Sequence, residues 1–247
     1  MVAPDSQSNN ALVTPRAILE GAGGARVLDV ATGQGGFVQF LIDGLGGFTE
    51  IIGIDISNRG EDAFEAAFGG RPAVRFQVMD GRAMSFASAS FDTVAISDSL
   101  HHFEDPNSVL HEMLRVLRPG GHLIVFEMYR DGQAPTQLTH VELHHWTAEI
   151  NQAEGVFHRE TYPRAELVRM LDALRLETVR SYDQVEMSDD PRDAATIAAN
   201  EQIIARFLGR AAGNPELVRR GEAIRERLHS VGIHGATELV YVGAKRA

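Results

Sequence analysis

The chain has 247 residues and a formal net charge of −11, an acidic balance that disfavours nucleic acids and anionic membranes as partners. It has no cysteine, which excludes disulfides, thiolate metal sites, iron–sulfur clusters and thiol nucleophiles. Hydrophobic residues make up 44% of it, enough for a sizeable core, so we expect one soluble globular domain. Because the acidic charge disfavours polyanions, we expect this domain to act on a small molecule.

The N-terminal region is polar. Residues 1–10 have neither a basic start nor an apolar run, so we expect no secretory signal, no membrane anchor and a cytoplasmic protein. The next segment carries Leu12, Ile18 and Leu19 and ends in glycines, which predicts a short helix that stops before Arg26.

Short apolar runs and amphipathic segments then alternate along the chain. Asp105 and Pro106 form a cap and first-turn pair for one of the helices, which the glycines of 118–121 close. This alternation predicts a parallel sheet covered on both faces, and ligands of such sheets bind at the carboxyl ends of the strands. Strands are predicted at 25–31, 49–57, 73–80, 90–97 and 122–129, and helices at 35–46, 61–70 and 106–117.

The C-terminal half departs from this alternation. Residues 130–160 are rich in histidine and polar side chains, and we interpret them as a substrate-side insertion. A helix is predicted at 161–177, while 178–187 and 237–246 alternate like an antiparallel edge pair. The mostly helical segment 189–232 is expected to be a lid or a dimer surface, which leaves a homodimer open. No linker divides the chain, so we expect a single domain over 1–247.

A glycine-rich turn follows the first predicted strand. Its glycines would let a ligand approach backbone N–H groups at a helix N-terminus, where an anion is favoured. The dinucleotide fingerprint wants a third glycine where this chain has Val38, and no lysine completes a Walker loop. A nicotinamide nucleotide stays as the alternative ligand, because Asp55 lies about 20 residues beyond Gly35, as that fingerprint requires.

Four ordered segments resemble the class I S-adenosylmethionine-dependent methyltransferases, most closely the small-molecule branch of ubiquinone and menaquinone methyltransferases (methyltransferase type 11). They are "LDVATGQGG", "GIDIS", "VMDGRAMSF" and "FDTVAISDSLHHFEDP" with the following "EMLRVLRPGGHLIVFE", and they span about residues 26–129. The resemblance implies an α/β, Rossmann-like, seven-stranded and mostly parallel sheet with helices on both faces and an antiparallel C-terminal edge pair. It also implies S-adenosylmethionine as methyl donor and S-adenosylhomocysteine as product.

The same resemblance assigns roles to side chains at the strand ends. Asp29 would hold the ammonium of the cofactor, Asp55 would accept hydrogen bonds from the ribose diol, and Asp80 would lie at the adenine amine. Ala31 stands where many members carry the first glycine of the turn, and Ser97 would lie near the transferring methyl. The full set expected to bind the cofactor is Asp29, Ala31, Gly33, Gly35, Asp55, Ile56, Asp80, Gly81, Arg82 and Ser97.

Methyl transfer from a sulfonium is an in-line displacement, so the protein mainly aligns the acceptor and excludes water. A base is needed only where the acceptor must lose a proton. We take Asp98, His101 and His144 as catalytic candidates, and a structural role is the alternative for the "LHHF" segment, which is common in this family. Further candidate bases are His102, His140, His145 and His158.

A metal site is the sharper hypothesis for the histidine-rich segment. On a helix, His140 and His144 would lie four residues apart on one face, a spacing that lets two imidazoles share an ion. Glu142, His158 or Glu160 would supply further ligands. Because such a spacing is frequent by coincidence, we expect no metal and interpret the histidines as substrate contacts or surface.

The sequence therefore predicts methyl transfer from S-adenosylmethionine to a small, neutral or apolar-aromatic acceptor. A nicotinamide-dependent oxidoreductase is the alternative from another enzyme class. A protein that binds S-adenosylmethionine without transferring its methyl group is the third hypothesis, and the acceptor atom and molecule are left open.

Overall fold

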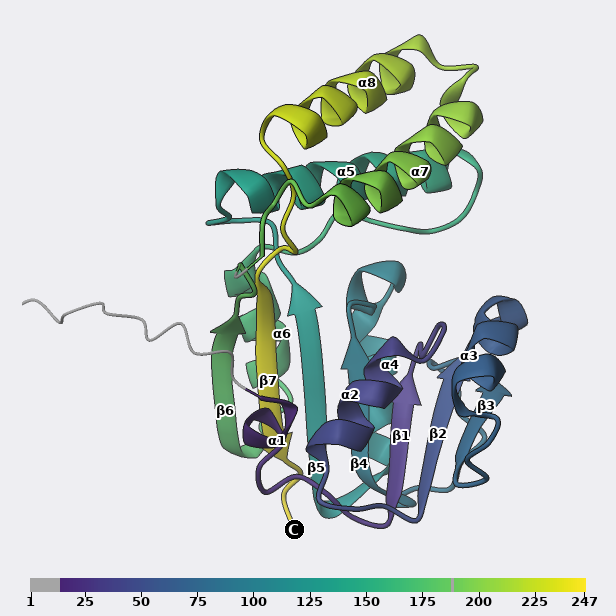
Figure 1. The fold of residues 1–247 in the computed structure, drawn as a ribbon. Helices are drawn as coiled ribbons and strands as arrows, with labels where there is room; N and C mark the ends of the chain where they lie inside the picture. The colour runs from purple at the N-terminus through teal and green to yellow at the C-terminus, as the bar shows by residue number, and fades with distance from the viewer. Residues whose placement is uncertain (1–13, 188) are drawn as a thin grey trace, which may run out of the picture.

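A computed structural model describes residues 14–187 and 189–247, so the predictions made for residues 1–10 and for Leu12 lie outside the described residues. One mixed sheet of seven strands runs through the molecule (Figure 1). Its strands are β1 (Arg26–Val30), β2 (Glu50–Asp55), β3 (Val74–Val78), β4 (Phe91–Ser97), β5 (Leu117–Met128), β6 (Glu177–Gln184) and β7 (Glu238–Ala244).

The strand order is β3-β2-β1-β4-β5-β7-β6. Strands β1 to β5 are parallel to one another, whereas β7 is antiparallel to both β5 and β6. The predicted class I, Rossmann-like fold with an antiparallel C-terminal edge pair is therefore confirmed. Because parallel neighbours end on the same side, the carboxyl ends of β1 to β5 share one edge of the sheet.

Eight helices are described, together with two short 3₁₀ helices. They are α1 (Pro15–Ile18), α2 (Gly36–Gly44), η1 (Asn58–Gly60), α3 (Glu61–Phe68), η2 (Leu100–His102), α4 (Pro106–Val116), α5 (Pro135–Ala153), α6 (Arg164–Asp172), α7 (Ala194–Ala211) and α8 (Pro215–Ser230).

Helices cover both faces of the sheet because successive strand residues point to opposite sides. In β1, Val27 packs in the core that contains α1, α2 and α3, while Leu28 packs in the core that contains α4 and α6. Side chains alternate in the same way in β2, where Ile51 and Ile52 belong to opposite cores. This three-layer arrangement leaves the carboxyl edge of the sheet for other elements.

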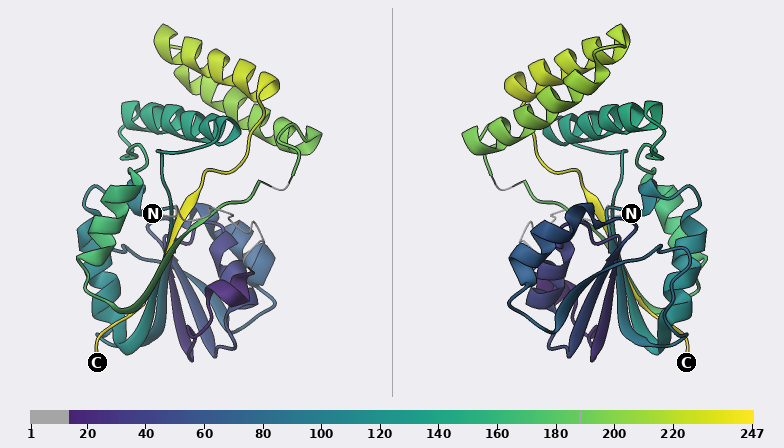
Figure 2. Two further views of the ribbon diagram at one scale, coloured as in Figure 1. Left: turned by 90° about the vertical axis from the view of Figure 1, so that its left-hand side faces the viewer. Right: turned by 90° about the vertical axis from the view of Figure 1, so that its right-hand side faces the viewer.

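Helices α5, α7 and α8 form a separate layer beyond that edge (Figures 1 and 2). Their apolar faces meet around Trp146, which is fully buried and donates from Nε1 to the Leu217 carbonyl at 2.8 Å. The segments 130–160 and 189–232, expected separately from the sequence, thus pack against each other. Among the residues that the structure describes, no helix is both long and apolar enough to cross a bilayer.

Some element boundaries differ from those predicted. Residues 118–121 do not close a helix but lie in β5, whose first residue Leu117 pairs with Phe91 of β4. The helix predicted over 161–177 is only α6, because Tyr162 forms a bridge with Tyr129 and Arg175 has a left-handed φ of 53°. Tertiary pairing and a local turn therefore shorten what side-chain spacing alone predicts.

Two glycines of the helical layer give a matched test of its packing. A Cβ on Gly221 of α8 would overlap the Trp146 ring and lie 2.7 Å from Leu208 Cδ2, whereas a Cβ on Gly209 of α7 would meet nothing within 4 Å. We expect Gly221→Ala to lower the free energy of unfolding by about 1–3 kcal/mol through overpacking. Gly209→Ala should raise it by roughly 0.5–1 kcal/mol, because alanine favours a helix. Urea unfolding measures both, and equal effects would contradict the packing described.

Candidate functional site

A cleft of about 520 Å³ opens at the carboxyl edge of the sheet, beside the ends of β1, β2 and β3. Most of the residues expected to bind a cofactor line it: Ala31, Gly33, Asp55, Ile56, Asp80, Gly81 and Arg82. The sequence reasoning did not select several others that also line it, namely Met79, Ser99, Phe103, Glu104 and Val156.

The turn after β1 is held by hydrogen bonds from its backbone N–H groups to the carboxyl end of β2. Thr32 N donates to the Ile54 carbonyl at 2.9 Å, and Gly33 N donates to Asp55 Oδ2 at 3.1 Å. The other oxygen of Asp55 accepts from Ser57 N at 3.1 Å. Asp55 therefore fixes the turn as well as lining the cleft.

The conformation of the turn explains its residue types. Ala31 has φ 58° and Gly33 has φ 53°, both in the left-handed region that favours glycine. Gly35 has φ 87°, and a Cβ there would lie 2.6 Å from Phe68 Cε2 and 2.9 Å from Phe64 Cδ2. Gly35 is thus required for the close approach of α3, and it is not among the residues that line the cleft.

Gly60 is a further residue that the sequence reasoning missed. It lies in η1, just before α3, and a Cβ there would overlap the carbonyl of Gly33. Its close approach holds the turn from the side of α3. A short polar segment such as 58–60 carries no recognisable motif, so only the structure reveals this contact.

Asp29 lies beneath the turn, outside the lining of the cleft. It is almost fully buried, and Thr32 Oγ1 donates to its Oδ2 at 2.6 Å. Its Oδ1 is buried without a hydrogen-bond partner among the described residues. Burial raises the pKa of Asp29 to about 7, because desolvation disfavours the charged carboxylate. A buried acceptor without a partner fits a cationic donor from a ligand.

Asp80 and Arg82 form a pair on the wall of the cleft. The Arg82 guanidinium donates to Asp80 Oδ2 at 2.8 Å, and Arg82 N donates to Asp80 Oδ1 at 2.9 Å. The hydrogen bond from the Arg82 side chain holds the pKa of Asp80 below its ordinary value. The carboxylate of Asp80 therefore stays ionised and available as an acceptor.

Part of the outer wall of the cleft is apolar, beside the exposed charged side chains of Arg82 and Glu104. Ile56 is 66% exposed, Val156 is 47% exposed and Phe157 is 42% exposed, and all three line the cleft. Large apolar side chains left in contact with solvent commonly mark a surface that a ligand or partner covers. These walls suit a ligand with a flat or apolar face.

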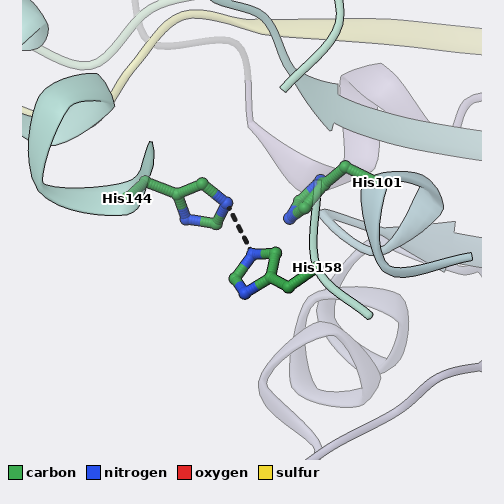
Figure 3. A group of neighbouring side chains, drawn as sticks. All are labelled: His101, His144 and His158. Atoms are coloured by element: carbon green, nitrogen blue, oxygen red, sulfur yellow. Dashed lines mark hydrogen bonds between the residues drawn. The ribbon is translucent and has the colours of Figure 1, made fainter. Parts of the chain in front are cut away.

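Histidines from three separate elements meet next to this cleft (Figure 3). His101 lies in η2, His144 in α5 and His158 in the loop after α5, and their ligand-type nitrogens lie within 4.8 Å of one another. The Nε2 atoms of His144 and His158 are 3.0 Å apart. The ring of His102, which lines the cleft, packs on His158 with 4.0 Å between ring centroids.

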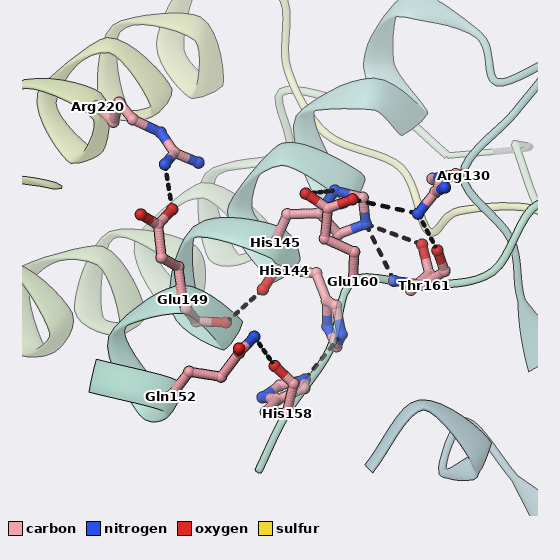
Figure 4. Close-up of polar contacts among 10 residues, drawn as sticks. Arg130, His144, His145, Glu149, Gln152, His158, Glu160, Thr161 and Arg220 are labelled. Carbon is pink, nitrogen blue, oxygen red and sulfur yellow. Dashed lines mark hydrogen bonds and ion pairs between the residues drawn. The ribbon is translucent and has the colours of Figure 1, made fainter. Parts of the chain in front are cut away.

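The metal ligands suggested by helical spacing do not come together as a set. His140 contacts a different part of the chain: its Nδ1 accepts from Ala236 N, just before β7, at 2.9 Å. Glu142 pairs with Arg227 at 3.4 Å, and Glu160 pairs with Arg130 at 3.1 Å (Figure 4). Of the residues considered together from the sequence, only His144 and His158 share one centre.

Ser97 and Asp98, at the end of β4, also lie outside the lining of the cleft. The Ser97 carbonyl accepts from Ser99 Oγ at 2.7 Å, and Asp98 Oδ1 accepts from Met128 N at 2.9 Å. Burial, together with the nearby Glu127, raises the pKa of Asp98. Burial likewise raises the pKa of Glu238 to about 9, with Asp98 adding to the shift. Asp98 and Glu238 thus form a partly buried acid pair that retains a proton.

Comparison with known proteins identifies the N-terminal half. Residues 28–125 match the family model described as a methyltransferase domain. A demethylmenaquinone methyltransferase of Renibacterium salmoninarum is 36% identical over 120 residues, which cover 48% of this chain and 48% of that protein. The chain thus spans about half the length of this curated relative.

Two solved structures share the fold over nearly the whole chain. The cyclase SpnF has a TM-score of 0.61 at 20% identity and covers 96% of this chain and 79% of its own. A phosphoethanolamine N-methyltransferase of Haemonchus contortus was solved with phosphomonomethylethanolamine and S-adenosylhomocysteine. It has a TM-score of 0.56 at 16% identity, over 94% of this chain and 52% of its own.

The partly buried acid pair predicts a pH dependence of stability. Between the ordinary pKa of 4.5 and the folded value of about 9, the folded chain keeps a proton on Glu238 that the unfolded chain releases. The free energy of unfolding should therefore fall as pH rises from 5 to 9, by up to about 1.4 kcal/mol per pH unit. Glu238→Gln should flatten this decline, and Glu226→Gln, at an exposed acid of α8, should not. Urea unfolding at pH 5, 7 and 9 tests this, and parallel curves for all three proteins would refute it.

Proposed function

We propose that this chain, which carries a methyltransferase domain on the class I Rossmann-like fold, transfers the methyl group of S-adenosylmethionine to a small-molecule acceptor. The observation that carries the proposal is the convergence, at one edge of the sheet, of the glycine turn, the unpartnered Oδ1 of Asp29 and the carboxylate of Asp55. An amino-acid ammonium and a ribose diol need acceptors of this kind.

Each part of the cofactor has a proposed partner. Asp29 Oδ1 would accept from the ammonium, with the backbone of Ala31 and Gly33 along the methionine part. Asp55 would accept from the ribose diol through lone pairs that Gly33 N and Ser57 N leave free. Asp80 would accept from the adenine amine, with Ile56 and Gly81 against the ring.

For methyl transfer the protein mainly has to align the acceptor with the methyl group and to exclude water. Bound S-adenosylmethionine supplies an electrophilic methyl group on a sulfonium. Phe103, Val156 and Phe157 would shield the acceptor from solvent, and the layer of α5, α7 and α8 would act as its lid. His102, which lines the cleft, is better positioned to accept a proton from the acceptor than the partly buried Asp98.

The acceptor class follows from the same walls. Aromatic and aliphatic side chains line part of the outer cleft, beside Arg82 and Glu104, and this apolar part would take a neutral or apolar-aromatic molecule. The names of the relatives span quinone and amine acceptors, which is consistent with an acceptor side that differs between proteins of one fold.

Calorimetric titration with S-adenosylhomocysteine, beside the reduced nicotinamide cofactor, tests the proposal. We expect saturable binding of S-adenosylhomocysteine alone. Asp55→Ala should weaken it by about 1–3 kcal/mol, roughly 5- to 150-fold, through lost hydrogen bonds to the diol. The exposed Asp62 of α3 gives the control Asp62→Ala, which should bind as the wild type does.

Each other outcome favours a different hypothesis. Binding of the nicotinamide cofactor instead would favour the oxidoreductase. Binding of S-adenosylhomocysteine without turnover across a broad panel of acceptors would favour a protein that binds the cofactor without methyl transfer. Unchanged affinity in Asp55→Ala would refute the role of β2 in holding the ribose.

A second prediction concerns Gly60, which contacts the turn after β1 but does not line the cleft. Gly60→Ala should push the Gly33 carbonyl outward and weaken binding of S-adenosylhomocysteine at least about 10-fold, although Gly60 does not line the cleft. Gly70→Ala, where a Cβ would meet nothing within 4 Å, is the matched control. Equal affinities of the two variants would show that the turn does not depend on this contact.

A further inference from the structure

We infer that His101, His144 and His158 form a binding site for one divalent transition-metal ion, such as Zn²⁺, beside the main cleft. The three imidazoles come from η2, α5 and the loop after α5, so the tertiary fold, not local spacing, brings them together (Figure 3). Neutral imidazole nitrogens are the ligands that such ions prefer in a site without thiolates.

The unsatisfied hydrogen-bonding capacity of the cluster points to a missing cation. His101 Nε2 is buried and has no hydrogen-bond partner among the described residues. The Nε2 atoms of His144 and His158 lie 3.0 Å apart and share one hydrogen bond, which an ion would replace. An ion at the centre would satisfy all three nitrogens, and an orphaned buried nitrogen otherwise carries a desolvation cost.

The distances fit a small ion. Zinc–nitrogen bonds of about 2.0–2.1 Å in a tetrahedral site place two ligand nitrogens roughly 3.3 Å apart. The 3.0 Å separation of His144 and His158 is close to this value, and the whole set lies within 4.8 Å. The set would have to contract from 4.8 Å toward this value when it binds an ion.

The surroundings of the rings resemble those of established metal sites. His101 Nδ1 hydrogen bonds to Glu127 Oε1, and both side chains are completely buried. The other oxygen of Glu127 accepts from the backbone N–H groups of Ser99 and Leu100, at 3.1 and 2.9 Å. A carboxylate behind a histidine orients the ring and turns its Nε2 lone pair toward the ion.

His158 is held by Asn151 of α5, whose Nδ2 lies 2.9 Å from His158 Nδ1. Binding of an ion at Nε2 would place the proton of this ring on Nδ1, so the amide of Asn151 would turn to present its Oδ1 as the acceptor.

Three protein ligands leave a fourth position, which is the pattern of catalytic zinc sites. His102 lies between this centre and the cleft, with its ring 4.0 Å from that of His158. An acceptor oxygen or nitrogen that reached the ion would lose its proton more readily, because the cation stabilises the anion. Metal binding itself does not depend on the proposed methyl transfer.

The test uses the full chain, purified without a histidine tag and freed of metal by chelation. We expect Zn²⁺ titration to saturate at one ion per chain, and Co²⁺ to give the visible absorption of a low-coordinate site. His144→Gln and His158→Gln should weaken binding at least about 100-fold, because even partners behind the ligands contribute about 10- to 100-fold. His145→Gln is the matched control on α5, since His145 instead contacts Thr161 Oγ1 at 2.9 Å (Figure 4).

Circular dichroism establishes whether each variant folds. If the ligand variants do not fold, the Zn²⁺ titration of the wild-type chain is the test. Absence of saturable one-to-one Zn²⁺ binding overturns the inference. Equal affinity in the folded ligand variants and the control also overturns it, because the ion would then bind elsewhere. Neither readout requires enzyme activity, so a failed methyl-transfer assay leaves this test intact.

Discussion

The carboxylate of Asp55 is the contact on which the cleft depends. It accepts one hydrogen bond from Gly33 N and one from Ser57 N, and so joins the turn after β1 to the end of β2. Around this contact the backbone leaves no room for a Cβ atom at two positions. A Cβ on Gly60 would overlap the Gly33 carbonyl, and a Cβ on Gly35 would overlap the aromatic rings of α3. The shape of the proposed cofactor site therefore follows from backbone contacts more than from the side chains facing the ligand.

The alternation of strands and helices was predictable because it is encoded locally. Each strand is a short apolar run, and each helix has apolar residues at helical spacing. That several of the acids expected at the cofactor lie at one edge of the sheet was predictable for the same reason, since they follow consecutive strands. The histidine centre was not, because His101, His144 and His158 lie far apart in the sequence. Local spacing instead favoured His140, whose Nδ1 is used by Ala236 N. The walls formed by Val156 and Phe157 follow α5 and carry no motif.

Burial of acids gives the carboxyl edge of the sheet a distinct electrostatic character. Asp29, Asp98, Glu127 and Glu238 all have raised pKa values there, because their carboxylates are removed from water. A cation placed near any of them restores the ionised form and is stabilised in return. An ammonium, a sulfonium and a metal ion are all cations, so one property of this edge suits the proposed cofactor and the inferred ion alike.

The layer of α5, α7 and α8 has its own apolar core around Trp146, separate from the two cores of the sheet. Stability in such proteins is distributed among units that open at different free energies. We therefore expect the helical layer to open as a unit of its own, and Val156, which lines the cleft, lies just beyond α5 of that layer. Opening of that unit would admit water to the cleft while the turn after β1 kept its shape, so access and recognition can be controlled independently within one chain.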